Sequence, residues 1–179
     1  MADGTWPAAE PTAIPRGARL GVDVGTVRIG VAASDPDGLI ATPVETVSRD
    51  LTAGADLPRI AAIAQDRGVA VIYVGLPRHL SGAESSASAA VRTYSVQLAQ
   101  AVAPVPVRLV DERMSTVTAH QALYASGRPG RRHRTVVDQA AAVVILQSAM
   151  DAERASGRRA GEPVVPGTAG GVLMRADGK

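Results

Sequence analysis

Four acidic residues in this 179-residue chain stand in surroundings that favour apolar side chains. Asp23 lies within LGVDVG, and Asp138 lies in VVDQAAAVVIL at the start of a helix-like stretch. The adjacent Asp111 and Glu112 follow the apolar run VPVRLV. A carboxylate among buried neighbours is costly unless it is paired or binds a cation. Each position has an ordinary structural explanation, as a turn residue, a strand-end cap or a first-turn helix acid, but together they indicate a site.

Clustered carboxylates repel one another, so such a site requires divalent cations. Oxygen ligands favour Mg²⁺ or Mn²⁺, and two such ions about 3.5–4 Å apart clamp the attacking and leaving oxygens of a phosphodiester displacement. The absence of cysteine excludes a thiol nucleophile and a cysteine-built zinc site, and three scattered histidines argue against a histidine-rich one. We therefore expect a two-metal site made of carboxylates.

A basic, acid-free stretch directly precedes Asp138. Its GRPGRRHR segment is interpreted as a flexible loop whose phosphate contacts would give sequence-independent, salt-sensitive affinity for nucleic acid. The alternative is a solvated loop that is basic by accident. With four aromatic residues in the chain, recognition should depend on backbone and shape rather than base stacking. The candidate substrate-binding residues of this stretch are Arg113, Arg128, Arg131, Arg132 and Arg134.

Hydrophobic periodicity predicts the elements that must position these residues. The expected order is β-β-β-α-β-α-β-α-α, which indicates an α/β fold with a mixed central sheet and helices on its faces. In such a sheet, residues at strand ends gather in one crevice, and a helix packed over that edge can add another side chain. The predicted strands are 19–25, 29–34, 39–47, 69–75 and 105–110, and the predicted helices are 57–67, 85–102, 115–126 and 136–154.

The two ends of the chain differ in composition from its middle. Residues 1–15 and 156–179 are rich in proline, glycine and alanine and lack apolar periodicity, so we expect flexible tails around one domain at 16–155. No apolar run approaches the roughly 18 residues of a membrane span. The N-terminus lacks the basic head and apolar stretch of a signal peptide. We expect a cytoplasmic protein.

Four motifs, in this order and spacing, resemble the YqgF family over about residues 18–151. They are LGVDVGTVRIGVA (20–32), VGLPRHLSG (74–82), DERMSTVTA (111–119) and VVDQAAAVVIL (136–146). Members of this family are described as nucleases of pre-16S ribosomal RNA and also as Holliday junction resolvases. The resemblance implies a ribonuclease H-like fold similar to the RuvC resolvases.

The resemblance also implies roles for particular residues. Asp23, Glu112 and Asp138 match the acids that the family is thought to use as catalytic metal ligands. The residues alone do not choose between Asp111 and Glu112; the resemblance favours Glu112, and whether Asp111 also contributes stays open.

Two arginines match basic positions of the family's motifs. Arg28 corresponds to the basic residue of the first motif and Arg113 to that of the DER motif, so both are expected to contact phosphate. Family members often have a lysine shortly before the helical acid. Here the nearest base is Arg134, which leaves open which base lies near the metals.

The leading hypothesis is a metal-dependent nuclease for structured nucleic acid that processes the 5′ end of pre-16S ribosomal RNA. One alternative is a Holliday junction resolvase acting on branched DNA, which should be a homodimer because it must nick two strands symmetrically. Another is a nucleic-acid-binding protein that does not cut. DVGT (23–26) also resembles the first phosphate loop of actin-like kinases, but one domain of this length cannot close two domains around a nucleotide.

Overall fold

The computed structural model describes residues 14–78, 81, 84–112 and 131–167 of the 179-residue chain. For residues 131–137 it describes the backbone only. The predicted helix 115–126 and the candidate phosphate contacts Arg113 and Arg128 lie outside these residues. No helix in the described ranges is long and apolar enough to cross a membrane.

A mixed sheet of six strands, in the order β3-β2-β1-β4-β5-β6, forms the centre of the molecule. The first three strands make an antiparallel meander, β4 and β5 run parallel to β1, and β6 pairs antiparallel with β5. This confirms the predicted mixed sheet. The strands are β1 (Ala18–Val24), β2 (Arg28–Ser34), β3 (Ala41–Ser48), β4 (Val69–Leu76), β5 (Val107–Asp111) and β6 (Glu162–Pro163).

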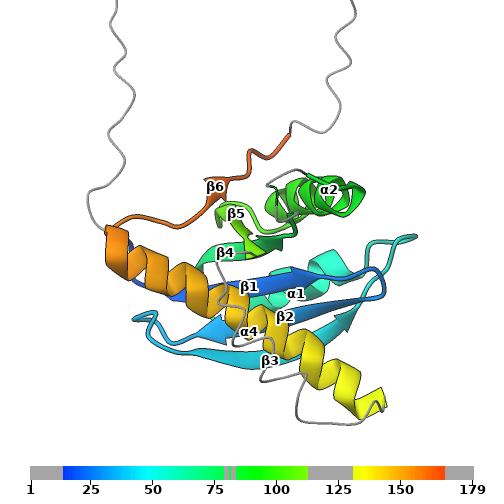
Figure 1. Cartoon of the computed structure of the whole chain (residues 1–179), viewed down its shortest axis with the longest axis horizontal. Helices are drawn as coiled ribbons and strands as arrows, with labels where there is room; N and C mark the ends of the chain where they lie inside the picture. The colour runs from blue at the N-terminus through cyan, green and yellow to red at the C-terminus, as the bar shows by residue number, and fades with distance from the viewer. Residues whose placement is uncertain (1–13, 79–80, 82–83, 113–130, 168–179) are drawn as a thin grey trace, which may run out of the picture.

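Helices cover both faces of this sheet (Figure 1). The long helix α4 (Arg131–Ser156) crosses β1, β2 and β3 on one face. The helices α1 (Asp56–Asp66) and α2 (Ser86–Ala101) pack against the other. α2 begins with a capping box, in which the side chains of Ser85 and Ser88 each accept a hydrogen bond from the other's backbone N–H.

The alternation of side chains along each strand separates the core into two layers. Leu20 and Val22 of β1 join the apolar cluster beneath α1 and α2, whereas Gly21 faces α4. Because successive strand residues point to opposite faces, Asp23 belongs to the α4 face. The pleat of β1 thus directs an acidic side chain toward the helix that carries Asp138.

Two predicted boundaries are corrected by the structure. α4 begins at Arg131 rather than at 136, so Arg131, Arg132 and Arg134 lie in the helix and not in a loop. Hydrophobic periodicity misses these turns because they are polar, but adding turns to an existing helix is much easier than nucleating one, and arginine favours helix. The segment after 156 contains β6, although the sequence pattern indicates no element there.

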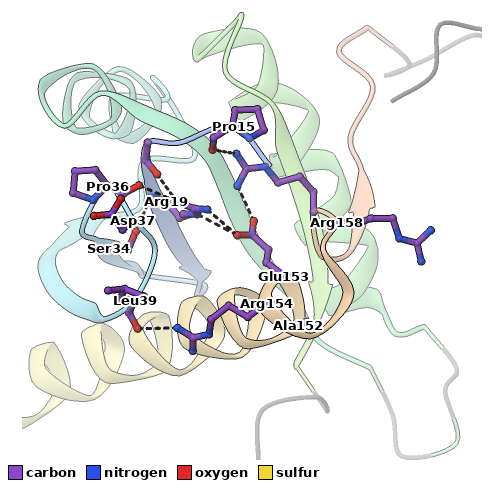
Figure 2. Close-up of polar contacts among 12 residues, drawn as sticks. Pro15, Arg19, Ser34, Pro36, Asp37, Leu39, Ala152, Glu153, Arg154 and Arg158 are labelled. Carbon is purple, nitrogen blue, oxygen red and sulfur yellow. Dashed lines mark hydrogen bonds and ion pairs between the residues drawn. The ribbon is translucent and has the colours of Figure 1, made fainter. Parts of the chain in front are cut away.

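A buried ion-pair network holds the C-terminal part of α4 to the sheet (Figure 2). The carboxylate of Glu153, 3 % exposed, accepts hydrogen bonds from Arg19 at 3.1 Å, from Arg159 at 2.7 Å and from the Tyr73 hydroxyl. Arg19 also donates to the carbonyl oxygens of Gly17 and Pro36. The network joins β1, β4 and α4 with the segment after α4.

Candidate active site

Asp23 and Asp138 lie close together because the strand residue between them, Gly30, has no side chain. Gly30 of β2 is paired with Asp23 of β1 across the antiparallel ladder. A Cβ atom at Gly30 would collide with the backbone carbonyl oxygen of Asp138, so α4 passes directly over this position. Because Gly30 has no side chain, the backbone of Asp138 lies directly against Gly30, the residue that pairs with Asp23.

Glu112 reaches the same face from the end of β5. Its Oε1 atom lies 2.8 Å from where a Cβ atom of Gly75 would stand. Gly75 is in β4, one residue beyond Val74, which pairs with Val22 of β1. The Glu112 side chain thus extends over β4 toward the strand of Asp23, in space that only a glycine leaves open.

The electrostatics of Glu112 reflect this crowding. Burial, followed by the negative charges of Asp23 and Asp111, raises the pKa of Glu112 to about 7. An apolar cavity of about 90 Å³, lined in part by Val110 and Ile145, adjoins the carboxyl group. The carboxyl groups of Asp23 and Asp111 are therefore close enough to Glu112 to oppose its ionisation.

Strand alternation bears on the choice between Asp111 and Glu112. Leu109 belongs to the cluster under α1 and α2, and Val110 to the cluster under α4. By this period of two, Asp111 has the phase of Leu109, whereas Glu112 has the phase of Val110 and of the α4 face. The geometry supports Glu112 as the partner of Asp23, with Asp111 as a nearby charge.

Arg28 occupies the first position of β2 and forms an ion pair with Asp138. Its Nε donates to Asp138 Oδ2 at 3.0 Å, and both side chains are about one-third exposed. The sequence predicts a phosphate contact for Arg28; here its cation lies at the carboxylate edge, beside a predicted metal ligand. The structure describes only the backbone of three other predicted arginines, Arg131, Arg132 and Arg134. They lie in α4, one to two helical turns before Asp138.

Arg78 lies beside the candidate site, and sequence reasoning does not single it out. It follows the Gly-Leu-Pro turn after β4, with Nε 3.9 Å from Asp111 Oδ2 and one terminal nitrogen 3.6 Å from Glu84. Its Nε is buried without a hydrogen-bond partner among the described residues. The sequence signal that could have suggested Arg78 is its place immediately after GLP in VGLPRHLSG. Its closeness to Asp111 is a tertiary contact, which the sequence does not reveal.

The donor chemistry of the site suits a hard divalent cation. All candidate ligands are carboxylate oxygens. Burial and then the neighbouring negative charges raise the pKa of Glu112, and a cation would offset both effects. Within the described ranges, however, no three acidic or histidine side chains form a group ready to hold a metal ion. The match between this site and a divalent cation therefore rests on the oxygen donors and on the charge repulsion around Glu112. Asp138 is paired with Arg28 in this structure.

Comparison with known proteins identifies the family. The family of RuvX, a Holliday junction resolvase, matches residues 17–152. The chain belongs to this family. A Streptomyces coelicolor protein is 54% identical over 153 residues, covering 83% of this chain and 89% of the relative. A Nocardioides protein is 57% identical over 150 residues, covering 83% and 96%. Both carry the provisional name of pre-16S rRNA nuclease.

The fold of this RuvX-family member is also found among solved structures. Thermus thermophilus RuvC, in complex with a Holliday junction substrate, aligns with a TM-score of 0.51 and 13% identity. The alignment covers 82% of this chain and 99% of that one. The likeness confirms the predicted ribonuclease H-like fold.

Proposed function

We propose that this chain is a metal-dependent nuclease that hydrolyses phosphodiester bonds of structured nucleic acid. The observation that carries the proposal is the meeting of Asp23, Glu112 and the backbone of Asp138 at one edge of the sheet, beside Arg28. A carboxyl group whose pKa is raised by burial and by neighbouring charges is typical of functional sites. Membership in a family of resolvases and close relatives named as nucleases support the same reaction class.

The three carboxylates would hold one or two Mg²⁺ or Mn²⁺ ions. Bound there, the ions would lower the pKa of an attacking water and neutralise charge on the phosphate. Asp23, fixed on a central strand, and Glu112 would orient the ligand set. Arg28 would release Asp138 and turn to a phosphate oxygen, because guanidinium binds phosphate and carboxylate with the same geometry.

We propose the precursor of 16S ribosomal RNA, trimmed at its 5′ end in the cytoplasm, as the substrate. The names of the Streptomyces and Nocardioides relatives support this choice. The test is Mg²⁺- or Mn²⁺-dependent cleavage of this precursor and of a four-way DNA junction by the wild type, Asp23→Asn and the exposed control Asp66→Asn. Wild type and Asp66→Asn should cut, and Asp23→Asn should not. Equal cleavage by all three would refute the proposal.

The family match favours a second candidate, a resolvase of branched DNA. Resolution requires symmetric nicks on two strands and therefore a homodimer. Sedimentation of the full chain at micromolar concentration decides this point, because a strict monomer argues against junction resolution and leaves RNA trimming intact. Tight binding without cleavage under any metal would instead indicate a non-catalytic binding protein.

A further inference from the structure

Arg78 is a cation at the carboxylate edge that forms no hydrogen bond with any described residue through its buried nitrogen. It follows the turn after β4, whose last residue, Leu76, pairs with Asp111 of β5. Its guanidinium lies 3.9 Å from Asp111 Oδ2 and 3.6 Å from Glu84 Oε1, which allows charge attraction but is too long for hydrogen bonds. A buried donor such as its Nε, without a partner in the described part of the chain, is costly and calls for an explanation.

The pairing of Glu84 does not account for Arg78. Both oxygens of Glu84 accept hydrogen bonds from Arg92 Nε, at 3.0 and 3.1 Å. Arg92 also pairs with Glu162 of β6, so this arginine joins α2 to the end of the sheet. Because Glu84 already has a closer cation, Arg78 is not needed to neutralise it.

The backbone at Arg78 is held in place by the start of α2. The carbonyl oxygen of Pro77 accepts a hydrogen bond from the hydroxyl of Ser88, a fully buried residue that also belongs to the capping box of α2. The Arg78 side chain beyond this anchor is 27 % exposed. A fixed backbone that presents a partly exposed guanidinium suits ligand binding, because little freedom is lost when the ligand binds.

Arginines and acids alternate across the carboxylate edge. Arg28 is on β2, Asp23 on β1, Arg78 directly after the β4 turn and Glu112 directly after β5, and these four strands are neighbours in the sheet. Adjacent strands lie about 4.8 Å apart, so the strands of the two arginines are about 10 Å apart, with the strand of Asp23 between them. A polyanion that crosses this edge would meet one arginine on each side of Asp23.

The two arginines also lie toward opposite faces of the sheet. Arg28 pairs with α4, whereas Arg78 lies near Asp111, which has the phase of the α1 and α2 face, and near the start of α2. A strand that contacts both would therefore pass over the edge from the α4 face to the α2 face.

A pocket of about 250 Å³ lies on this second side and begins at the residue before Arg78. Its lining is largely apolar and includes Pro77, the residues after Asp23 and one side of α2: Val24, Gly25, Thr26, Ala87, Ala90 and Val91. Such walls can pack against a sugar or the face of a base, and they offer no basis for choosing between bases. The neighbouring guanidinium would then take the phosphate.

We propose that Arg78 binds a backbone phosphate of the substrate strand, on the α2 side of the carboxylate edge and across Asp23 from Arg28. This inference rests on the proposed nuclease function for the identity of the ligand. A guanidinium presents paired N–H donors that match two oxygens of a phosphate. Phosphate contacts position a strand without reading its sequence, so Arg78 should affect the affinity for all sequences alike.

The test is the salt dependence of binding, measured by fluorescence anisotropy with the full chain in a chelator. The labelled probes are a four-way DNA junction and a fragment of pre-16S ribosomal RNA that includes its 5′ end, in salt from about 50 to about 200 mM. Arg78→Gln should bind about tenfold more weakly at the lowest salt. The slope of log affinity against log salt should become shallower by about 0.7–0.9, the value for one lost phosphate contact.

Two further variants make the result specific. Arg67→Gln changes an exposed arginine at the end of α1, directly before β4 and therefore at the opposite end of the sheet, and should bind like the wild type. Arg78→Lys keeps the charge but lacks the paired donors, so it should keep the slope and bind about threefold more weakly.

Equal slopes for the wild type and Arg78→Gln would overturn the proposal. A lower melting temperature of Arg78→Gln with an unchanged slope would mean that the arginine only stabilises the fold. Equal losses in Arg78→Gln and Arg67→Gln would also overturn it, because the effect would then come from total charge. If Arg78→Gln does not fold, Arg78→Lys decides, and an affinity equal to that of the wild type rejects the paired contact.

The proposed nuclease function can fail separately from this contact. A wild type that shows the Arg78-dependent slope but cuts neither probe with any metal keeps the contact and refutes the nuclease. Cleavage that is lost in Asp23→Asn, together with an unchanged slope in Arg78→Gln, keeps the nuclease and refutes the contact. If the wild type binds neither probe at micromolar concentration, both are refuted.

Discussion

Glu112 carries a carboxyl group whose ionisation the fold opposes. Its pKa is about 7 in the folded chain against about 4.5 for an ordinary glutamate. A raised carboxyl pKa leaves stability intact below pH 4.5 and lowers it as pH rises toward and through 7, because the folded state then holds an unfavourable charge. Burial of Glu112, followed by its acidic neighbours, thus makes this edge of the metal-free sheet less stable at neutral and alkaline pH.

Glu112→Gln should therefore be more stable than the metal-free wild type at pH 8, by up to about 2 kcal/mol once solvent screening is allowed for, and nearly equal to it at pH 4.5. Thermal melts of both proteins across this range, in the presence of a chelator, measure the difference. A difference that stays constant with pH would contradict the raised pKa.

Sequence reasoning finds acids more readily than their cationic neighbours. Asp23 and Asp138 interrupt apolar patterns, and the pair Asp111 and Glu112 ends one, so these acids are visible as exceptions. Arg78 interrupts nothing, since it follows a turn, and its closeness to Asp111 depends on the pairing of β4 with β5. Asp56 likewise looks like an ordinary first-turn acid until its burial is known.

At the scale of elements, α4 depends on a glycine for its position over the sheet. Gly30→Ala should lower the free energy of unfolding by about 3 kcal/mol, because its Cβ meets the carbonyl of Asp138 and the helix must move. Cleavage should fall as well, since Asp138 moves with the helix. Chemical denaturation and cleavage assays test both effects.

The control for this substitution is Gly68→Asn, at a position with φ +57° and no atom within 4 Å of an added Cβ. Asparagine tolerates this conformation, so the loss should stay under about 1 kcal/mol. If both variants lose the same stability, close packing of α4 is not the cause at Gly30.

The buried network anchors the other end of the same helix. Glu153→Gln should cost about 3 kcal/mol or more, because Arg19 and Arg159 both lose the charge that compensates their burial. Asp151→Asn, on the same helix but in an exposed pair with Arg154, should cost no more than about 1 kcal/mol. Urea denaturation of the two variants gives the comparison, and equal losses would mean that Glu153 is not a buried anchor.

The sequence predicts strands and helices well where apolar residues repeat, and less well where an element is polar or very short. The strands of the meander agree with the pattern to within a few residues. β1 and β2 are runs of almost continuously buried residues, and β3 is buried near both of its ends. The first turns of α4 and the two residues of β6 have no apolar repeat, and they form because an existing helix or strand extends or pairs with them.

For the molecule as a whole, the segment after α4 belongs to the folded structure at least through β6. Arg108 donates hydrogen bonds to the carbonyl oxygens of Ala160 and Gly161, both at 2.6 Å, and Arg159 reaches Glu153. A chain that ends at Ser156 should lose about 2–4 kcal/mol of unfolding free energy and expose an edge of β5 to association.

A chain that ends at Gly167 keeps all these contacts and should melt like the full chain. Differential scanning calorimetry and light scattering of the two truncations test this prediction. Equal melting temperatures for the two would show that the C-terminal segment contributes nothing beyond α4.

The order of the elements along the chain has a consequence during biosynthesis. A nascent chain emerges with its N-terminal part first, and β1, β2 and β3 are neighbours in sequence as well as in the sheet. Asp23 is therefore in place early, whereas Asp138 arrives only with α4, the last helix in the described part of the chain. A polypeptide interrupted before that helix lacks one of the three carboxylates and the helix that packs over the sheet. We therefore expect the proposed nuclease activity only from chains that include α4.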